Sequence, residues 1–183
     1  AEDKEIAGSY HPDFVAGLNL GFDYKDFDFN IFLFASYGND IFDITREFTI
    51  FRLFNTNVRT DMLTNSWRPD RPSTEFPQLD QNDNFSSAYS SYYVEDGSYL
   101  RAKTMQLGYT LPQSVASKIN GSIRVYLQAQ NLFTLTNYSN VDPALPAINR
   151  NQNGVNVTDF TAGIDRGTYP ANRLISLGVN ANF

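Results

Sequence analysis

Cysteine is absent from the sequence and histidine occurs once, and these two shortages exclude several classes of function. Without cysteine the chain has no disulfide framework, no zinc–thiolate site and no thiol nucleophile. His11 stands beside Pro12 with no second histidine, and we interpret it as a loop residue rather than a metal ligand. A G-x-S-x-G sequence is missing as well. We therefore predict that the chain is not an enzyme and carries no cofactor or catalytic metal.

Long apolar runs and a surplus of positive charge are also missing. No run of about 18 apolar residues occurs, so the sequence contains no membrane-spanning helix. The formal net charge of −6 argues against a nucleic-acid-binding surface. The chain begins at Ala1, with neither a methionine nor a signal peptide. We interpret it as a processed product or as a fragment of a longer protein.

Aromatic residues, in contrast, are abundant: they make up 15% of the chain, with 15 Phe and 11 Tyr among many Asn, Asp, Ser and Gly. This mixture is typical of alternating strands joined by polar loops. Residues 173–183 alternate most clearly, and their apolar face consists of Ile175, Leu177, Val179, Ala181 and Phe183. A soluble sheet and a lipid-facing barrel strand both produce this pattern. The terminal aromatic favours the barrel, whose strands carry aromatics at the membrane interface.

Residues 14–24 and 27–37 form a predicted hairpin around residues 25–26. In a two-residue hairpin Tyr24 pairs with Phe27, and paired residues point to the same face. Every further pair on that face is then apolar. A slip by one residue would set these apolar side chains against polar ones. The apolar face is about ten residues long, which is enough to cross a membrane when the strand is tilted.

Three further strands continue the pattern, and we place them at 98–110, 122–133 and 172–183. The joins alternate in length, with short ones at 25–26 and 111–121 and long ones at 38–97 and 134–171. Antiparallel strands put alternate joins at opposite ends, so the long segments are external and the short ones periplasmic, as in outer-membrane barrels. The predicted fold class is therefore all-β, a transmembrane antiparallel up-and-down β-barrel. Because open strand edges are not tolerated in lipid, these strands must pair with others.

The joins contain some local structure. Residues 41–54 fit a helical stripe and a strand equally well, and 57–66 fit a short helix. Pro112 suits the first position of a helix of one or two turns in the second short join. Residues 80–84 space oxygen ligands as a calcium loop does, but they lack the glycine and the distal glutamate of an EF-hand. Structural calcium there stays a hypothesis beside the solvated loop that we favour.

Charged residues within strands indicate the lumen or the rim, since a charge on the lipid face near the midplane costs about 2–4 kcal/mol. We expect Arg124 to face the lumen or the rim. Arg101 and Lys103 share the parity of Met105, so we place them beyond the apolar band, toward the external end. Four glycines fall on the polar face, where they provide either room for a plug or substrate or relief of strand coiling. They are Gly17, Gly21, Gly108 and Gly178.

An ordered series of segments resembles one family. The segments are 94–103 (VEDGSYLRAK), 107–112 (LGYTLP), 124–134, 138–143, 167–170 and the terminal strand. Together they resemble the late barrel of the SusC/RagA family, which are TonB-dependent outer-membrane transporters of Bacteroidetes. The resemblance covers nearly the whole chain.

This resemblance implies a bacterial outer-membrane location and a 22-stranded barrel, of which the chain would be the last five strands. It implies a plug domain and a TonB-contacting segment, neither of which is in this chain. It also implies a SusD-like surface lipoprotein as a lid, outer-membrane lipid around the barrel, and glycans or peptides as cargo. By the same resemblance, Phe183 belongs to the signal that the barrel-assembly machinery reads.

The predicted function is therefore a share in TonB-dependent import. A passive or structural outer-membrane barrel, or an adhesin, uses the same strand pattern without energy coupling. A soluble β-rich glycan-binding module is a weaker third alternative. Four aromatics of the long external segment are candidates for contact with sugar rings or the lid, and ordinary loop packing explains them equally well. They are Trp67, Tyr89, Tyr92 and Tyr93.

Overall fold

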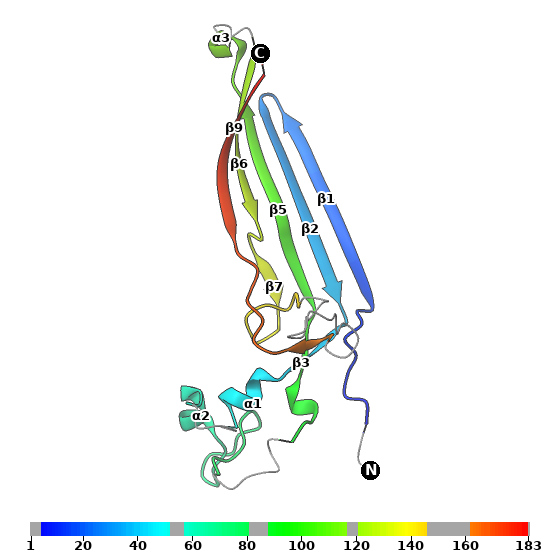
Figure 1. The fold of residues 1–183 in the computed structure, drawn as a ribbon, viewed down its shortest axis with the longest axis vertical. Helices are drawn as coiled ribbons and strands as arrows, with labels where there is room; N and C mark the ends of the chain where they lie inside the picture. The colour runs from blue at the N-terminus through cyan, green and yellow to red at the C-terminus, as the bar shows by residue number, and fades with distance from the viewer. Residues whose placement is uncertain (1–4, 52–56, 81–87, 117–120, 146–161, 183) are drawn as a thin grey trace, which may run out of the picture.

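One antiparallel sheet dominates the computed structural model, which describes residues 5–51, 57–80, 88–116, 121–145 and 162–182 (Figure 1). Its strands, in spatial order, are β1 (Phe14–Tyr24), β2 (Phe27–Tyr37), β5 (Tyr99–Thr110), β6 (Ser122–Gln130) and β9 (Leu174–Asn182). A short strand, β7 (Thr134–Thr136), pairs with the first residues of β5. The sheet order follows the chain, as an up-and-down barrel wall requires.

The β1–β2 hairpin has the register that the sequence predicts. Phe14 pairs with Tyr37 at one end and Tyr24 pairs with Phe27 at the other. Lys25 adopts a φ of 56°, the left-handed conformation that a tight two-residue turn demands. The alternation of side chains was therefore sufficient to fix this pairing.

A second, three-stranded sheet and the helices occupy the joins. Its strands are β4 (Val94–Asp96), β3 (Asp40–Asp43) and β8 (Ile164–Asp165), in the order β4-β3-β8. The helices are α1 (Thr45–Thr49), α2 (Thr60–Asn65), the 3₁₀ turn η1 (Ser91–Tyr93) and α3 (Gln113–Ala116). The ambiguous stretch 41–54 thus begins in β3 and continues in α1, and its residues 52–54 lie outside the described residues. Among the described residues, no helix is both long and apolar enough to cross a membrane.

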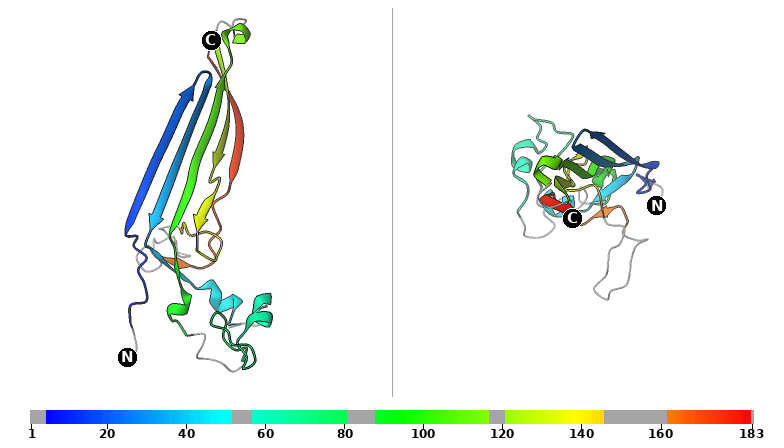
Figure 2. Two further views of the ribbon diagram at one scale, coloured as in Figure 1. Left: turned by 180° about the vertical axis from the view of Figure 1, so that it is seen from behind. Right: turned by 90° about the horizontal axis from the view of Figure 1, so that it is seen from above.

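The joins are sorted between the two ends of the main sheet. The β1–β2 turn and α3 lie at one end, whereas β3, α1 and α2 lie beyond the other, as both side views show (Figures 1 and 2). This is the predicted distribution, with short joins on one side and long ones on the other. We call the end with the long joins the external end.

Two predicted strand boundaries are wrong. We expected one strand over 122–133 and a loop from 134, but β6 ends at Gln130 and the sheet resumes at Thr134 in β7. Asn131 stands in the gap with a φ of 49°. A polar residue that tolerates this conformation lets the chain kink without leaving the sheet.

β5 is interrupted at the same level by a β-bulge. Phe32 pairs with Thr104 and Leu33 pairs with Ala102, so Lys103 is an extra residue in β5. An extra residue reverses the alternation on one side of the bulge. Arg101 consequently pairs with Phe34 on the polar face. Arg101 lies near the external end of β5, as expected, but the prediction that it shares a face with Met105 is wrong because it assumed an unbroken strand.

The apolar face of the main sheet is exposed in the part of the chain that the structure describes. Phe22 is 60% exposed in β1 and Leu177 is 74% exposed in β9. A soluble monomer seldom exposes a continuous apolar surface of this size, whereas the outer face of a barrel in lipid requires it. The compact apolar core lies instead in the external loops, around Ile50, Met62 and Phe76.

Candidate functional site

The polar face of the sheet is crossed by an ion pair between strands that are not neighbours. Arg124 of β6 reaches over β5 to Asp28 of β2, and its Nε donates to Asp28 Oδ1 at 2.8 Å. Arg124 also donates to Gln106 at 3.3 Å, and its guanidinium lies 5.1 Å from the centroid of the Tyr126 ring. A Cβ on Gly108 would collide with both members of the pair. Gly108 is therefore the residue of β5 that lets the pair form.

The other three glycines of this face also lie under neighbouring side chains. The Tyr126 ring covers Gly178, and the Phe32 ring lies 3.2 Å from the position of a Cβ on Gly17. Asn30 covers Gly21 in the same way. Open room, one of the two interpretations offered by the sequence, does not describe these sites, whereas relief of strand coiling stays a prediction. The glycines leave the space that these neighbouring side chains occupy.

At the external end the polar face carries a buried ion pair. The side chains of Arg101 and Asp142 are 3% and 8% exposed, and Arg101 Nη2 pairs with Asp142 Oδ1. Arg101 Nε also donates to Thr134 Oγ1 at 2.8 Å. Asp142 accepts from the backbone N–H groups of Ala144 and Ala171, each at 2.9 Å. Burial alone would raise the pKa of Asp142, but these hydrogen bonds and the Arg101 charge hold it below its usual value.

A second buried polar cluster lies in the small sheet. Asp43 of β3 and Asp165 of β8 are directly paired on parallel strands and are 3% and 2% exposed. The Tyr138 hydroxyl donates to Asp165 Oδ2 at 2.8 Å, and Asn140 Nδ2 donates to the same oxygen at 3.1 Å. Burial raises the pKa of Asp43, and the nearby Asp165 charge adds to the effect. Burial and the bond to Asp165 raise the pKa of Tyr138.

A third set of contacts joins Ser139, which lies between Tyr138 and Asn140, to β4. Glu95 pairs with Arg46 of α1 and accepts two hydrogen bonds from Ser139, from its N–H at 2.9 Å and its hydroxyl at 2.7 Å. Within the described residues, every buried side-chain nitrogen and oxygen has a hydrogen-bond partner. The external loops are thus held by satisfied polar contacts as well as by their small apolar core.

Three of the four predicted aromatics come together. Tyr93 is fully buried, with its ring 5.4 Å from that of Phe42, and burial raises its pKa to about 12. Tyr92 is partly buried and donates its hydroxyl to the Glu75 carbonyl at 2.8 Å. Tyr89 is 63% exposed and meets Tyr93 edge-on. The fourth, Trp67, is partly buried just after α2.

The residues predicted to face lipid in the terminal strand are exposed, as is all of β9 except Gly178, so their contact with lipid stays a prediction. Ile175, Leu177 and Val179 are 59%, 74% and 61% exposed, and Ala181 is exposed as well. Phe183 lies outside the described residues. So do residues 81–84 of the calcium hypothesis, and the part of the chain that is described contains no cluster of three metal-binding side chains.

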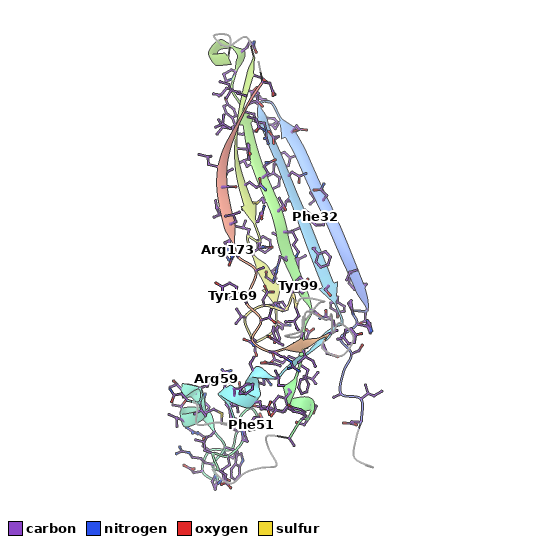
Figure 3. All side chains as sticks on the ribbon, in the orientation of Figure 1. Phe32, Phe51, Arg59, Tyr99, Tyr169 and Arg173 are labelled. Carbon is purple, nitrogen blue, oxygen red and sulfur yellow. The ribbon has the colours of Figure 1, made fainter. Side chains whose placement is uncertain are left out.

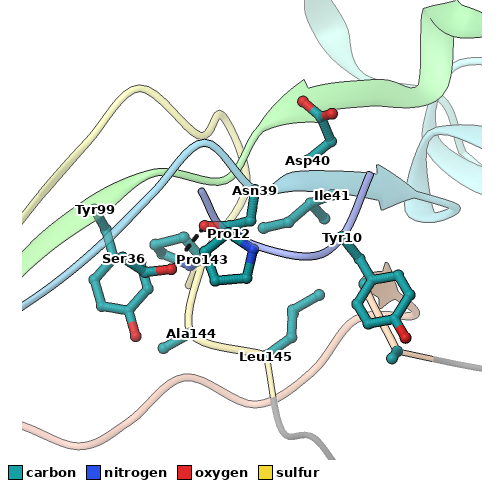
Figure 4. Close-up of a pocket in the computed structure, with 12 residues that line it drawn as sticks. Tyr10, Pro12, Ser36, Asn39, Asp40, Ile41, Tyr99, Pro143, Ala144 and Leu145 are labelled. Atoms are coloured by element: carbon teal, nitrogen blue, oxygen red, sulfur yellow. Dashed lines mark hydrogen bonds between the residues drawn. The ribbon is translucent and has the colours of Figure 1, made fainter. Parts of the chain in front are cut away.

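A hollow of about 220 Å³ opens where the loops meet the wall (Figure 4). Its lining includes Ser36 and Tyr99, which pair across β2 and β5, and residues 143–145. Figure 3 shows Tyr99 at the external end of the sheet and Phe32 farther along the wall. Sequence reasoning missed both this hollow and the Arg101–Asp142 pair. The available signal that β5 contains a bulge was the position of Arg101 and Lys103, two cations that an unbroken strand would place on the apolar face.

Comparisons with known proteins give a consistent result. No protein-family model matches the chain. TonB-dependent receptor P3 of Formosa agariphila is 35% identical over 184 residues, which is 99% of this chain and 17% of that protein. TonB-dependent receptor SusC of Bacteroides thetaiotaomicron is 26% identical over 183 residues, which is 99% of this chain and 16% of that protein. The chain thus spans about a sixth of the length of these curated relatives.

Solved structures agree. The RagAB peptide transporter matches with a TM-score of 0.74 and 28% identity over 95% of this chain and 18% of that one. The 'open-open' state of the RagAB peptide importer matches with a TM-score of 0.73 and 27% identity over 97% of this chain. The predicted β-barrel fold and outer-membrane location are confirmed. The chain is homologous, along nearly its whole length, to a segment of the SusC/RagA group of TonB-dependent outer-membrane receptors.

Proposed function

We propose that this chain is part of an outer-membrane TonB-dependent active transporter and supplies the last five strands of a 22-stranded barrel with their external loops. The observation that carries the proposal is its similarity, over its whole length, to TonB-dependent receptors. The exposed apolar face and the polar face crossed by Arg124 and Asp28 support it as the lipid and lumen sides of a barrel wall. The plug and the TonB-contacting segment would belong to the rest of the protein.

Peptides or oligosaccharides are the proposed cargo, and a SusD-like lipoprotein is the proposed lid over the external loops. The similarity to a peptide importer supports the peptide alternative. Of the four candidate aromatics, Tyr89 is the one whose ring is mostly exposed, so we assign it direct contact with the lid or cargo. Tyr93 supports that surface from beneath by packing against Tyr89 and Phe42.

The transport proposal is tested with the full-length receptor in its native membrane. We expect cells to take up fluorescent peptides or oligosaccharides only when the receptor is present, and a protonophore to stop this uptake. Uptake that continues after the protonophore would indicate a passive barrel instead. Binding of the probes to the cell surface without uptake in either condition would indicate an adhesin.

The lid proposal is tested by co-purification. We expect a surface lipoprotein to co-purify with the receptor, and Tyr89→Ala to lower its yield. Tyr24→Ala is the matched control, because Tyr24 is equally exposed, at 64%, but is the last residue of β1, at the opposite end of the sheet. Equal yields from both variants would contradict the assignment of Tyr89.

A further inference from the structure

Residues 138–145, which we call the strap, lie across the polar face of the wall at its external end. Asp142 in the strap pairs with Arg101, which the bulge in β5 turns to that face. Residues 143–145 line the same hollow as Ser36 and Tyr99, which also belong to the polar face (Figure 4). The strap therefore folds inward over the wall instead of extending away from the barrel.

The strap is held at two points on different elements. Asp142 bonds to Arg101 of β5, and Tyr138, which is 5% exposed, bonds to Asp165 of β8. Val141 lies between the two anchors and is 65% exposed. A short segment fixed at two buried points has little freedom to swing, so its position over the wall is set by the anchors.

Asp142 joins three parts of the chain. Its carboxylate accepts from Arg101 of the wall, from the backbone of Ala144 within the strap, and from the backbone of Ala171, which leads into β9. Charge-assisted bonds of this kind are stronger than neutral ones, and burial removes the competition from water. Arg101 is the one charged residue among these three partners of Asp142, and its guanidinium group also donates to Thr134 of β7.

We propose that the strap is a fixed constriction at the external mouth of the barrel and that Arg101 is the positioning residue that keeps it against the inner wall. Cargo entering the lumen passes the exposed side of the strap, while residues 143–145 on its other side line the hollow against the wall. This inference rests on the proposed transport function. Its geometry, however, can be tested without any cargo.

The test measures labelling by a membrane-impermeant maleimide on intact cells that make the full-length receptor. Ala144→Cys places a thiol on the wall side of the strap, and Val141→Cys places one on its exposed side. We expect Val141→Cys to react fast and Ala144→Cys to react slowly. Adding Arg101→Met should speed the reaction of Ala144→Cys at least tenfold, equivalent to about 1.4 kcal/mol of lost anchoring.

Two further variants separate a positioning role from general damage. Arg59→Met breaks an exposed ion pair with Asp61 in the same loops and should leave the rate at Ala144→Cys unchanged. Asp142→Asn removes the charge from the strap side and should act like Arg101→Met, which keeps the test valid if one of the two fails to assemble. Arg101→Lys should restore slow labelling in part, because it keeps the charge but loses the fork.

The inference is overturned if neither Arg101→Met nor Asp142→Asn raises the labelling of Ala144→Cys above that of the parent at equal receptor amounts. It is also overturned if Ala144→Cys and Val141→Cys react equally fast in the parent. Failure of the transport proposal would look different. Energy-dependent uptake would then be absent while the contrast between the two thiols remained.

Discussion

The buried Arg101–Asp142 pair gives the sharpest prediction on stability. Arg101→Met keeps the length of the side chain and removes its charge. Asp142 then remains buried with only the Ala144 and Ala171 N–H groups as donors. We expect the free energy of unfolding of the full-length receptor to fall by about 3–5 kcal/mol, the usual cost of removing one member of a buried pair.

The effect should depend on pH, and its sign follows from Asp142. The pKa of this carboxyl is lower in the folded protein than its usual value of about 3.9. A depressed acid pKa contributes stability that is fully present above about pH 4 and is lost as the pH falls through the folded value. In Arg101→Met, burial raises the pKa of Asp142 instead. Lowering the pH then protonates Asp142 and removes the unpaired buried charge that destabilises the variant. The difference between the two proteins should therefore shrink below about pH 5.

The assay is denaturant unfolding of the purified full-length receptor in lipid bilayers at several pH values. Arg59→Met is the matched control, because its partner Asp61 is much more exposed than Asp142, and its effect should be far smaller. A loss caused only by packing would not change with pH. The reasoning is refuted if Arg101→Met costs no more than Arg59→Met, or if its cost is the same at pH 4 and pH 7.

Three further changes are informative. Deleting Lys103 should keep the register between β2 and β5, because the rungs to β2 become consecutive, but it should lower the amount of assembled receptor, because the Lys103 carbonyl accepts the Asn131 N–H; normal surface levels would contradict this reading of β5. Gly108→Ala should lower the free energy of unfolding by about 1–3 kcal/mol, because the added methyl displaces Arg124, and an unchanged denaturation midpoint would contradict the close contact. Deleting Phe183 should reduce insertion more than the transport rate per inserted receptor, and immunoblots showing normal barrel levels would count against it.

The hairpin of the main sheet was predictable in detail because its pattern is local. A period of two over residues 14–37 leaves one register in which every pair on the face of Tyr24 and Phe27 is apolar. The sorting of short and long joins was predictable for a similar reason, since it follows from strand direction alone. Neither conclusion needed a contact between distant parts of the chain.

The external end was not predictable because its contacts join residues far apart in sequence. Arg101 meets Asp142 and Asp43 meets Asn140 across separations of 41 and 97 residues. No periodicity reports such pairs. The bulge at Lys103 was missed although it reverses the face of Arg101, because its one trace in the sequence is the pair of cations that share the parity of the apolar face. The candidate aromatics were recognised as a group, but their division into buried Tyr93 and exposed Tyr89 depends on packing.

The ion pair over Gly108 has a consequence for the order of assembly. Arg124 and Asp28 lie on β6 and β2, which share no backbone hydrogen bonds, because β5 lies between them. The pair can close only after β5 has been inserted between its two neighbours in the correct stagger. In a closed barrel the stagger of the strands sets tilt and diameter together. The Arg124–Asp28 contact therefore distinguishes a sheet with the correct strand order and register from one in which β5 is missing between β2 and β6 or is paired out of register.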